Sequence, residues 1–288
     1  MKKVIIAIIL LSLILIIGGF WLAGNSLTAP MPARVGNCPP ELLCENIEFS
    51  SESGSNIKGW FVKGEPEKGA IVLMHGLRSN RLALIERIRF LRKAGYSVLA
   101  FDFQGSGESI GKSLTFGYLE SRDATASLKY IKTRLPNQKV GVVGISMGGA
   151  AFLLQTEPNK ADALILEMVY PTIQKAIENR LKLWIFSGAE NLSPLMTWQF
   201  PLRLGISVDQ LRPLDKIKNV TCPILVIAGE NDHHTTLVES RQLFETANQP
   251  KEIWIVPQAE HTDLQKNAPA EYEAKVLGFF QKTLEGDK

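Results

Sequence analysis

The 288-residue sequence predicts an α/β protein with a mostly parallel, doubly wound sheet, an inserted helical cap and a preceding N-terminal transmembrane helix. Three observations predict this class. Short apolar runs alternate with longer segments of helical spacing, most of these runs are apolar on both faces, and a long uncharged segment precedes them. Strands that are apolar on both faces are typical of parallel sheets with helices on either side.

Composition excludes several other classes of protein. With 45% hydrophobic and 21% charged residues, the chain is neither disordered nor a coiled coil. Lys2 and Lys3 supply most of the net charge of +3, and no basic cluster of the kind that binds nucleic acid follows them, so we expect no nucleic-acid partner. Three cysteines exclude a cysteine-built zinc module and allow at most one internal disulfide.

The N-terminal segment, residues 4–24, carries no formal charge and consists mostly of Ile and Leu. At about 1.5 Å per residue, a helix of this length spans a hydrocarbon core of roughly 30 Å. A cleaved signal peptide is the alternative, with Gly24-Asn25-Ser26 as the one tolerable cleavage site. We expect a retained single-pass anchor. Because Lys2 and Lys3 precede the span and Arg34 is the first charge after it, the main domain is expected on the non-cytoplasmic side of the membrane.

Residues 25–43 are expected to form a tether, and the main domain then covers residues 44–288. The tether contains Pro30, Pro32, Pro39 and Pro40, a composition that suits extended chain. Cys38 and Cys44 lie just beyond the membrane, where oxidation is allowed, so a small disulfide loop is our hypothesis and two free thiols are the alternative. Cys222 is expected to be a buried small hydrophobic residue.

Strand and helix patterns alternate along the main domain. The expected strands are residues 70–74, 96–101, 139–143, 163–166, 224–228 and 252–256. The expected helices are residues 81–93, 119–134, 237–246 and 270–283. Two earlier runs, residues 46–50 and 56–62, are expected to pair as an antiparallel edge of the same sheet.

The alternation stops between about residues 170 and 220, where we expect an inserted cap. Residues 183–202 contain Glu190 as their only formal charge. Their large apolar side chains are those of Leu183, Trp184, Ile185, Phe186, Leu195, Met196, Trp198 and Phe200. Most of them are expected to pack the cap onto the sheet, and the alternative is that some line an apolar acyl pocket.

The pattern G-x-S-x-G occurs twice, around Ser109 and around Ser146, so the context must decide between the two serines. Ser146 lies between an expected strand, residues 139–143, and a helix-compatible run, residues 148–154. A sharp strand-to-helix turn of this kind exposes a nucleophilic hydroxyl above a sheet. Ser109 lies in a Gly- and Ser-rich loop with no helix directly after it, and is expected to be a loop residue.

The loop around Ser109 also contains two partial nucleotide-binding motifs. Gly111-Lys112-Ser113 ends like a phosphate-binding loop, but Ser106 stands where that loop needs a glycine. Gly105-Ser106-Gly107 begins like a dinucleotide fingerprint, but position 110 is Ile and no helix begins there. A nucleotide-binding protein is therefore the runner-up from another class.

A serine hydroxyl needs a base, and an acid that orients this base, to become a nucleophile at neutral pH. His261 follows the last expected strand through a short turn, and Asp232 follows the strand at residues 224–228. Both therefore lie at the carboxyl edge of the sheet, where Ser146 also lies. The chain order Ser, Asp, His is that of the nucleophile-elbow architecture, so we expect Ser146, Asp232 and His261 to form a catalytic triad.

The other histidines have less specific contexts. His233 and His234 are adjacent, and neighbouring residues seldom bind one metal ion together. The sequence also has no HExxH pattern, so no metal is expected. His75 ends an expected strand, and the turn after it is expected to offer the backbone N–H of Leu77 to a developing oxyanion. The N–H of Met147, the residue after the nucleophile, is its expected partner.

With these motifs the sequence resembles the α/β-hydrolase family, particularly its serine esterases and S33-like peptidases, over about residues 45–285. Beyond the serine turn, the resemblance rests on Leu73-Met74-His75-Gly76, on residues 102–109 and on residues 227–232. It implies that Asp102 and its glycine loop support the oxyanion turn and do not titrate. In one departure, Gln258-Ala259-Glu260 precede His261, whereas the family often has a glycine there.

Together these features predict a membrane-anchored serine hydrolase of carboxylic esters, with a small-molecule or lipid-like acyl substrate and no cofactor. Because His261 must be neutral to act as a base, activity is expected to fall on acidification. Peptides and thioesters are cleaved by the same machinery and stay open as substrates. A catalytically idle exported scaffold is the non-enzymatic alternative.

Overall fold

A large sheet of eight strands forms the centre of the computed structural model, which describes residues 1–157 and 161–285. The strands are β2 (Cys44–Ser50), β3 (Asn56–Val62), β4 (Ala70–Met74), β5 (Ser97–Phe101), β7 (Val140–Ile145), β8 (Ala163–Glu167), β9 (Ile224–Gly229) and β10 (Lys251–Val256). Their order is β10-β9-β8-β7-β4-β5-β3-β2. Strands β4, β5 and β7 to β10 pair in parallel, whereas β3 pairs with β2 and β5 in antiparallel fashion. The predicted fold class is confirmed.

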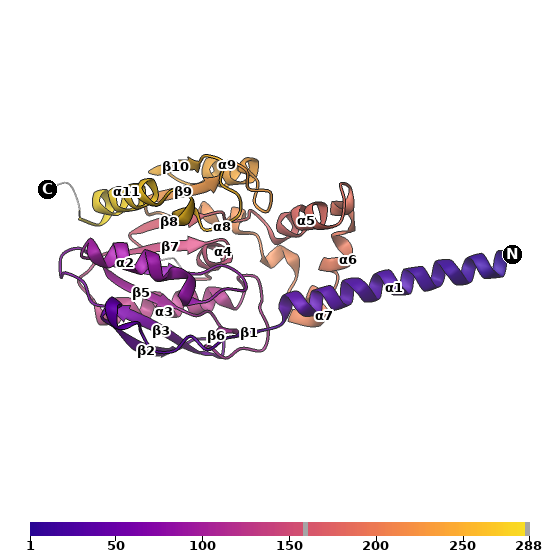
Figure 1. The fold of residues 1–288 in the computed structure, drawn as a ribbon, viewed down its shortest axis with the longest axis horizontal. Coiled ribbons are helices and arrows are strands. Elements are labelled where there is room, and N and C mark those ends of the chain that lie inside the picture. Colours follow the sequence, from indigo (N-terminus) through magenta and orange to yellow (C-terminus); the bar gives the residue numbers. More distant parts are fainter. Residues whose placement is uncertain (158–160, 286–288) are drawn as a thin grey trace.

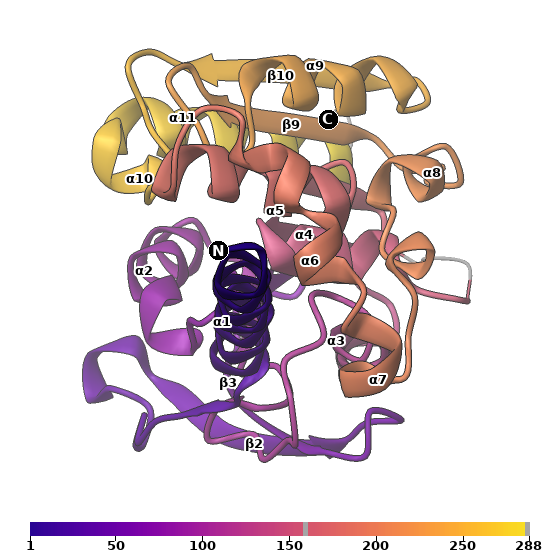
Figure 2. The same cartoon turned by 90° about the vertical axis from the view of Figure 1, so that its right-hand side faces the viewer.

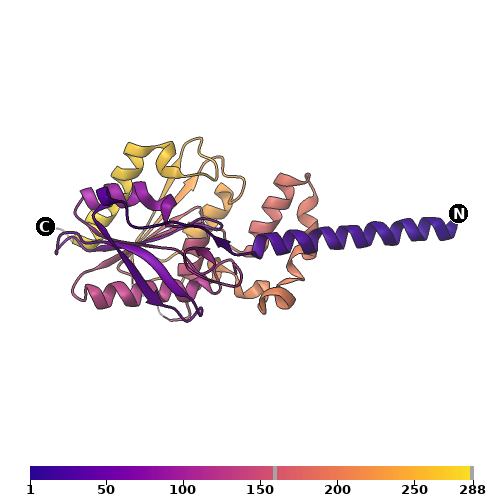
Figure 3. The same ribbon diagram turned by 60° about the horizontal axis from the view of Figure 1, so that its bottom comes forward.

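Helices cover both faces of this sheet, because successive side chains of a strand point to opposite faces. In β4, side chains 70, 72 and 74 pack on one face, and side chains 71 and 73 pack on the other. The first face carries α3 (Glu120–Arg134), α4 (Met147–Leu153) and α9 (Leu237–Thr246); the second carries α2 (Ile85–Lys93) and α11 (Pro269–Phe280). Figure 3 shows helices on both sides of the sheet.

Several short elements complete the domain. They are the 3-10 turns Pro40–Leu42 and Arg81–Leu84, the helix α10 (Leu264–Asn267) and a π-helical turn, Gln281–Glu285, which follows α11. The helix predicted at residues 81–93 therefore begins as a 3-10 turn, and the one predicted at residues 270–283 ends as a π-helical turn. Asn80 caps the Arg81–Leu84 turn, since its side chain accepts the N–H of Leu82.

Helix α1 (Lys2–Thr28) projects from one end of the molecule (Figures 1 and 3). Its most apolar stretch has a mean hydropathy of 2.9, and none of that stretch is buried within the protein. The helix is long and apolar enough to cross a membrane. It continues to Thr28, beyond the predicted end of the span at residue 24, and Gly24 and Thr28 are buried against the rest of the chain.

The segment after α1 is partly paired with the domain. Strand β1 (Met31–Pro32) pairs in parallel with β6 (Ser106–Gly107), and the two form a separate small sheet. The Ala33 N–H continues this pairing, since it donates to the Gly107 carbonyl at 2.8 Å. Composition indicated only extended chain for this segment. Extended backbone pairs readily with an open loop edge, and such an edge cannot be recognised from composition.

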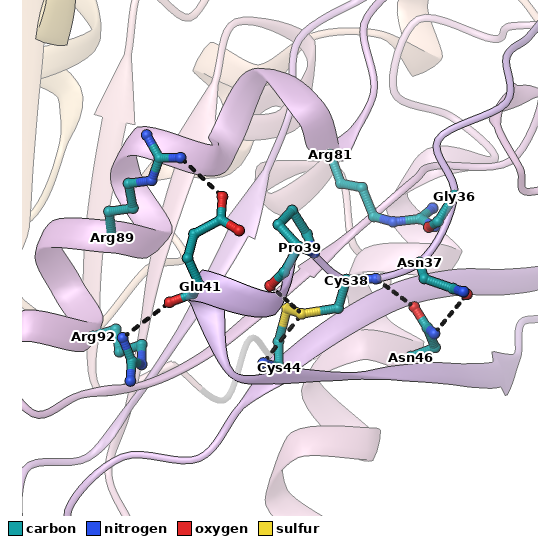
Figure 4. Close-up of a disulfide and its surroundings, with 10 residues drawn as sticks. All are labelled: Gly36, Asn37, Cys38, Pro39, Glu41, Cys44, Asn46, Arg81, Arg89 and Arg92. Carbon is teal, nitrogen blue, oxygen red and sulfur yellow. Dashed lines mark hydrogen bonds and ion pairs between the residues drawn. A yellow bond between two sulfur atoms is a disulfide. The ribbon is translucent and has the colours of Figure 1, made fainter.

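A disulfide joins the end of this segment to the beginning of β2 (Figure 4). It links Cys38 to Cys44, whose Cα atoms are 5.7 Å apart, in agreement with the hypothesis from the sequence. The Cys38 N–H also donates to Asn46 Oδ1 at 3.0 Å, which holds the loop against β2. Cys222 has a free thiol and is only partly buried against the core, whereas the sequence predicted a buried residue. This partial burial raises its pKa to about 12.

The chain between β8 and β9 is fully described and forms helices without strands, in the region where we expected a cap. These helices are α5 (Ile173–Trp184), α6 (Pro194–Thr197), α7 (Phe200–Leu204) and α8 (Pro213–Ile217), with 3-10 turns at Ala189–Leu192 and Val208–Gln210. Helices α5, α6 and α7 lie at the end of the molecule from which α1 projects, beside its last turns (Figures 1 and 2).

Candidate active site

Ser146 forms the turn between β7 and α4 and has a φ of +49°. A positive φ is strained for a residue with a Cβ, so the surrounding structure must hold it. Two glycines allow this turn to close. A Cβ at Gly144 would lie 2.5 Å from Gly149 Cα, and a Cβ at Gly148 would lie 2.4 Å from the Met74 carbonyl oxygen. The turn therefore has the close-packed geometry of a nucleophile elbow.

Asp232 and His261 follow β9 and β10, and their side chains are hydrogen-bonded to each other. His261 Nδ1 lies 2.7 Å from Asp232 Oδ2. The other carboxylate oxygen, Oδ1, accepts the backbone N–H groups of His234 and Thr235 at 2.7 and 2.8 Å. Only 3% of Asp232 is exposed, so both of its oxygens are fixed. A ring hydrogen on Nδ1 leaves Nε2 of His261 as the basic nitrogen.

Ser146 and His261 line the same cavity, which has a volume of about 430 Å³. We call it the mouth cavity; its other walls include Leu77, Arg180, Trp184 and His234. Among the hydrogen bonds of residues 1–157 and 161–285, none joins the Ser146 hydroxyl to His261. The structure thus brings Asp232 and His261 into contact and has Ser146 on a wall of the cavity that His261 also borders.

His234 stacks on the His261 ring, with ring centroids 5.1 Å apart and an interplanar angle of 10°. Trp184 contacts the His234 ring edge-on, at 5.7 Å between centroids. Burial lowers the pKa of His234, and the nearby positive charge of Arg180 acts in the same direction. His234 therefore adds a flat neutral surface beside His261 and no charge at neutral pH.

A second cavity, of about 70 Å³, begins at Ser146, Leu77 and Met147 and extends beneath the cap. We call it the inner pocket. Among the described hydrogen bonds, neither the Leu77 N–H nor the Met147 N–H has an acceptor within the chain. Two free N–H groups beside a serine hydroxyl are what an oxyanion hole requires.

The turn that carries Leu77 is held by His75. Nδ1 of His75 lies 2.8 Å from the carbonyl oxygen of the next residue, and Nε2 accepts the Phe103 N–H at 3.0 Å. These two contacts need a neutral ring, and burial accordingly lowers the pKa of His75. Asp102 forms a buried ion pair with the Arg81 guanidinium, and its Oδ1 also accepts the Arg81 N–H at 2.8 Å.

The loop that carries His261 is held by Arg87, which is buried beside the mouth cavity. Its Nη1 donates to Asp263 Oδ1 at 2.9 Å, and its Nη2 donates to Glu167 Oε2 at 2.9 Å. Asp263 belongs to the His261 loop, and Glu167 ends β8. One guanidinium therefore connects this loop to the edge of the sheet.

Ser109, the serine of the second G-x-S-x-G pattern, has contacts of a different kind. It is 2% exposed, its hydroxyl donates to the Asp102 carbonyl at 2.7 Å, and it accepts the Lys58 N–H at 2.9 Å. Its hydroxyl thus joins the loop after β5 to β3 and does not face the mouth cavity or the inner pocket.

Beyond Ser146, Leu77 and Met147, the walls of the inner pocket come from the cap, from Phe116 in the loop before α3, and from α1. The apolar walls from the cap are Tyr170, Ile173, Met196 and Phe200. The last turns of α1 add Gly24, Leu27 and Thr28. Met196 and Phe200 are among the residues for which the sequence left packing and pocket roles open, and they line the pocket. By contrast, Leu183, Trp184, Ile185, Phe186 and Trp198 are exposed, so the expectation that most of these side chains pack the cap onto the sheet is wrong.

Sequence reasoning missed Arg180, the His234 stack and the contribution of α1 to the pocket. Arg180 lies on α5 and lines both cavities, and its Nη1 donates to the Ala176 carbonyl at 2.9 Å. None of the ion pairs among the described residues includes it. No local sequence signal distinguishes Arg180 from an ordinary surface arginine, since its position depends on how the cap folds over the sheet.

Comparisons with known proteins agree with this geometry. A family model described as serine aminopeptidase, S33, matches residues 65–206, and one described as the prolyl oligopeptidase family matches residues 180–287. An esterase of Pyrococcus furiosus is similar in structure, with 26% identity, a TM-score of 0.73, and coverage of 90% of this chain and 99% of its own.

Two relatives extend the comparison to eukaryotes. An α/β-hydrolase domain-containing protein of Arabidopsis thaliana is 27% identical over 91% of this chain and 85% of its own length. A lysophosphatidylserine lipase of Macaca fascicularis is 28% identical over 65% of this chain and 48% of its own length. From the eight-stranded sheet, the serine turn and these similarities, we conclude that the chain belongs to the α/β-hydrolase family, in its S33-like group.

Proposed function

We propose that this chain is a membrane-anchored serine hydrolase of carboxylic esters, with Ser146 as the nucleophile, His261 as the base and Asp232 as the group that orients the base. The observation that carries the proposal is the 2.7 Å hydrogen bond from His261 Nδ1 to Asp232, beside a cavity that also borders the strained Ser146 turn. This bond leaves Nε2 free to accept a proton, which is what activation of a serine hydroxyl requires.

In the acylation step, Ser146 Oγ attacks the carbonyl carbon of the ester while His261 Nε2 takes the hydroxyl proton. The tetrahedral intermediate then collapses, the bond to the alcohol oxygen breaks, and His261 protonates the leaving alcohol. Water attacks the acyl-enzyme with the help of the same base, which releases the acid and restores Ser146. This step needs a hydrogen bond from Ser146 to His261. Catalytic hydrogen bonds of this kind often tighten only when substrate binds.

The backbone N–H groups of Leu77 and Met147 donate to the carbonyl oxygen as it becomes negative. A donor of this kind lowers the transition-state free energy by about 2.7–4 kcal/mol. His75 supports the role of Leu77, because its neutral ring connects the carbonyl of Gly76, which precedes Leu77, to the Phe103 N–H. The free N–H groups therefore need no rearrangement before they meet the oxyanion.

An acyl group without charge suits the inner pocket, whose walls are mainly apolar. The similar esterase of Pyrococcus furiosus supports ester substrates, and the similar lysophosphatidylserine lipase of Macaca fascicularis supports lipid-like esters. Peptides are the second candidate, because both matching family models describe peptidases. Thioesters are cleaved by the same chemistry and form the third.

The proposal includes retention of α1 as a single-pass anchor, with the hydrolase domain on the non-cytoplasmic side. Lys2 and Lys3 before the apolar stretch support this orientation, and the Cys38–Cys44 disulfide supports an oxidising compartment. We expect the mass of membrane-extracted protein to include all of α1. A soluble protein that begins near residue 25 would instead indicate a cleaved signal peptide.

A fluorophosphonate probe, which modifies activated serines, tests the assignment of the nucleophile. We expect labelling of the detergent-extracted protein, loss of labelling in Ser146→Ala, and retained labelling in Ser109→Ala, the matched control from the second motif. Labelling that persists in Ser146→Ala contradicts the proposed nucleophile. A wild-type protein that is folded but not labelled supports the idle scaffold.

Turnover of matched substrates tests the substrate class. A panel of p-nitrophenyl esters of graded acyl length is compared with p-nitroanilides of amino acids and short peptides. We expect the esters to have the higher kcat/KM. Faster turnover of the anilides would make the chain a peptidase that uses the same three residues.

A further inference from the structure

Helices α1 and α5 enclose a third cavity, an apolar groove of about 560 Å³ on the outer side of the cap. We call it the helix groove. One face of α1 supplies Leu15, Ile16, Gly19, Phe20 and Ala23, and α5 supplies Ile177, Leu181 and Trp184. At about 1.5 Å per residue, the stretch of α1 from Leu15 to Leu27 runs about 18 Å along the helix axis. The groove therefore begins well inside the segment that is apolar enough to cross a membrane.

The helix groove shares walls with both cavities at the candidate active site. Leu27 and Arg180 line the helix groove, the inner pocket and the mouth cavity alike. Ile177 and Met196 line both the groove and the inner pocket. The inner pocket ends at Ser146. The helix groove is therefore adjacent to the inner pocket, and the inner pocket borders Ser146.

The last turns of α1 are attached to the cap by directed contacts. Gln199 Nε2 donates to the Phe20 carbonyl at 2.9 Å, and Arg203 donates to the Trp21 carbonyl and to Asn25 Oδ1, each at 2.9 Å. The Gln199 side chain also packs directly on Gly24, since a Cβ at Gly24 would lie 2.3 Å from the Gln199 side-chain oxygen. These contacts fix the position of α1 relative to the inner pocket.

Large apolar side chains of the cap are exposed, and two of them, Trp184 and Ile185, line the groove. These exposed side chains include Trp184, Ile185, Phe186, Trp198 and Leu202. They belong to the cap, which lies at the end of the molecule from which α1 projects (Figure 2). A cluster of exposed apolar and aromatic side chains marks an interaction surface, and tryptophans are typical of the membrane interface. With α1 in a bilayer, the groove opens toward lipid rather than toward water.

We propose that α1 is one wall of the acyl-binding channel, and that the substrate is a long-chain ester resident in the membrane whose acyl chain enters sideways, between α1 and α5. This inference rests on the proposed esterase function and names its substrate class. The chain leaves the hydrocarbon of the bilayer and enters the apolar groove, so its methylene groups stay out of water along the whole path. Short esters reach Ser146 through the mouth cavity and do not need the groove.

Two glycines on α1 provide a test with a matched control. Gly19 lines the groove and Gly18 does not, and a Cβ at either position would meet nothing within 4 Å. Neighbouring residues on a helix point about 100° apart. Gly19→Trp therefore places an indole in the groove and narrows it, whereas Gly18→Trp adds the same side chain on a different side of α1. Both variants keep the anchor, the cap contacts and Ser146.

The full-length protein is reconstituted in phosphatidylcholine vesicles and assayed with p-nitrophenyl palmitate and p-nitrophenyl acetate. We expect Gly19→Trp to reduce kcat/KM for the palmitate by about tenfold or more, the size of effect that pocket shape has on apolar substrates. Acetate turnover should stay at the wild-type level, and Gly18→Trp should leave both substrates unaffected. Equal palmitate turnover in Gly19→Trp and wild type would overturn the lateral path.

The acetate arm separates failure of this inference from failure of the proposed function. If wild-type turnover of both esters is absent, or persists in Ser146→Ala, the esterase assignment itself is wrong, and the channel proposal falls with it. If acetate turnover depends on Ser146 and palmitate turnover is the same in all glycine variants, only the channel is wrong. If Gly19→Trp lowers acetate turnover as strongly as palmitate turnover, the substitution has disturbed the site rather than the groove, which also counts against the channel.

Discussion

Replacing Asp232 by Asn is expected to remove almost all activity while leaving the fold intact, because the two carboxylate oxygens have different partners. Oδ1 accepts the backbone N–H groups of His234 and Thr235, and Oδ2 accepts the hydrogen on His261 Nδ1. An Asn side chain has one oxygen acceptor and one NH₂ donor. At the Oδ1 position the NH₂ group would meet two N–H donors, so the oxygen stays there and the NH₂ group faces His261.

The NH₂ group of the introduced amide would then donate to His261 Nδ1, which must become an acceptor. The ring hydrogen moves to Nε2, and Nε2 can no longer take the proton of Ser146. A triad base held in the wrong tautomer loses roughly ten-thousandfold in kcat, which corresponds to about 5 kcal/mol in the transition state. The assay is hydrolysis of p-nitrophenyl acetate under saturating conditions, with urea unfolding measured on the same protein.

Glu230→Gln is the matched control, since it makes the same chemical change at the same strand end. Glu230 accepts the Gln258 N–H at 2.9 Å through an oxygen that Gln retains, and it has no hydrogen bond to His261 among the described residues. We expect its kcat to be close to that of the wild type. If folded Asp232→Asn protein kept kcat within about tenfold of the wild-type value, Asp232 would not be the residue that sets the tautomer of the base.

Three further predictions concern stability, measured by urea unfolding of the detergent-extracted protein. Gly148→Ala should destabilise the fold by about 1–3 kcal/mol, because its Cβ would lie 2.4 Å from the Met74 carbonyl oxygen. Gly278→Ala is the control and should not destabilise the fold, because its Cβ would meet nothing within 4 Å. Cys38→Ser should cost about 2 kcal/mol through loss of the short disulfide loop, and added reductant should then have no further effect. Burial lowers the pKa of His75, so below about pH 6.5 the unfolded state takes up a proton that the folded state does not. The free energy of unfolding should therefore fall on acidification, and it should fall less steeply in His75→Gln.

The strands were predictable because burial on both faces leaves a continuous apolar run in the sequence. Strands β3 and β4 have the expected bounds, and the others differ by one or two residues at their ends. Strand ends are harder to predict because the last pairs of a ladder depend on the neighbouring strand. The pairing of β1 with β6 was not predictable, since neither two-residue segment has a pattern of its own.

The candidate site was predictable only as far as strand order determines it. Ser146, Asp232 and His261 follow β7, β9 and β10, and parallel strands direct the residues after them to one edge of a sheet. The stacking of His234 on His261 and the contacts of Arg87 with the His261 loop depend on how separate turns fold over that edge. These contacts join residues far apart in the chain, and no local pattern encodes them.

Helix α1 shows why composition alone did not reveal the helix groove. A helix that faces lipid on one side and an acyl chain on the other needs apolar side chains on both, so it has no amphipathic pattern to distinguish the two faces. Deleting residues 1–28 would therefore do more than release the domain from a membrane. It would remove Gly24, Leu27 and Thr28 from the wall of the inner pocket and open the pocket to water. Such a shortened protein keeps all three proposed triad residues, so we expect it to cleave short esters, but with a preference for acyl length that differs from that of the full chain. On the proposed channel, we therefore expect preferences for acyl length to be measured correctly only on the protein that retains α1.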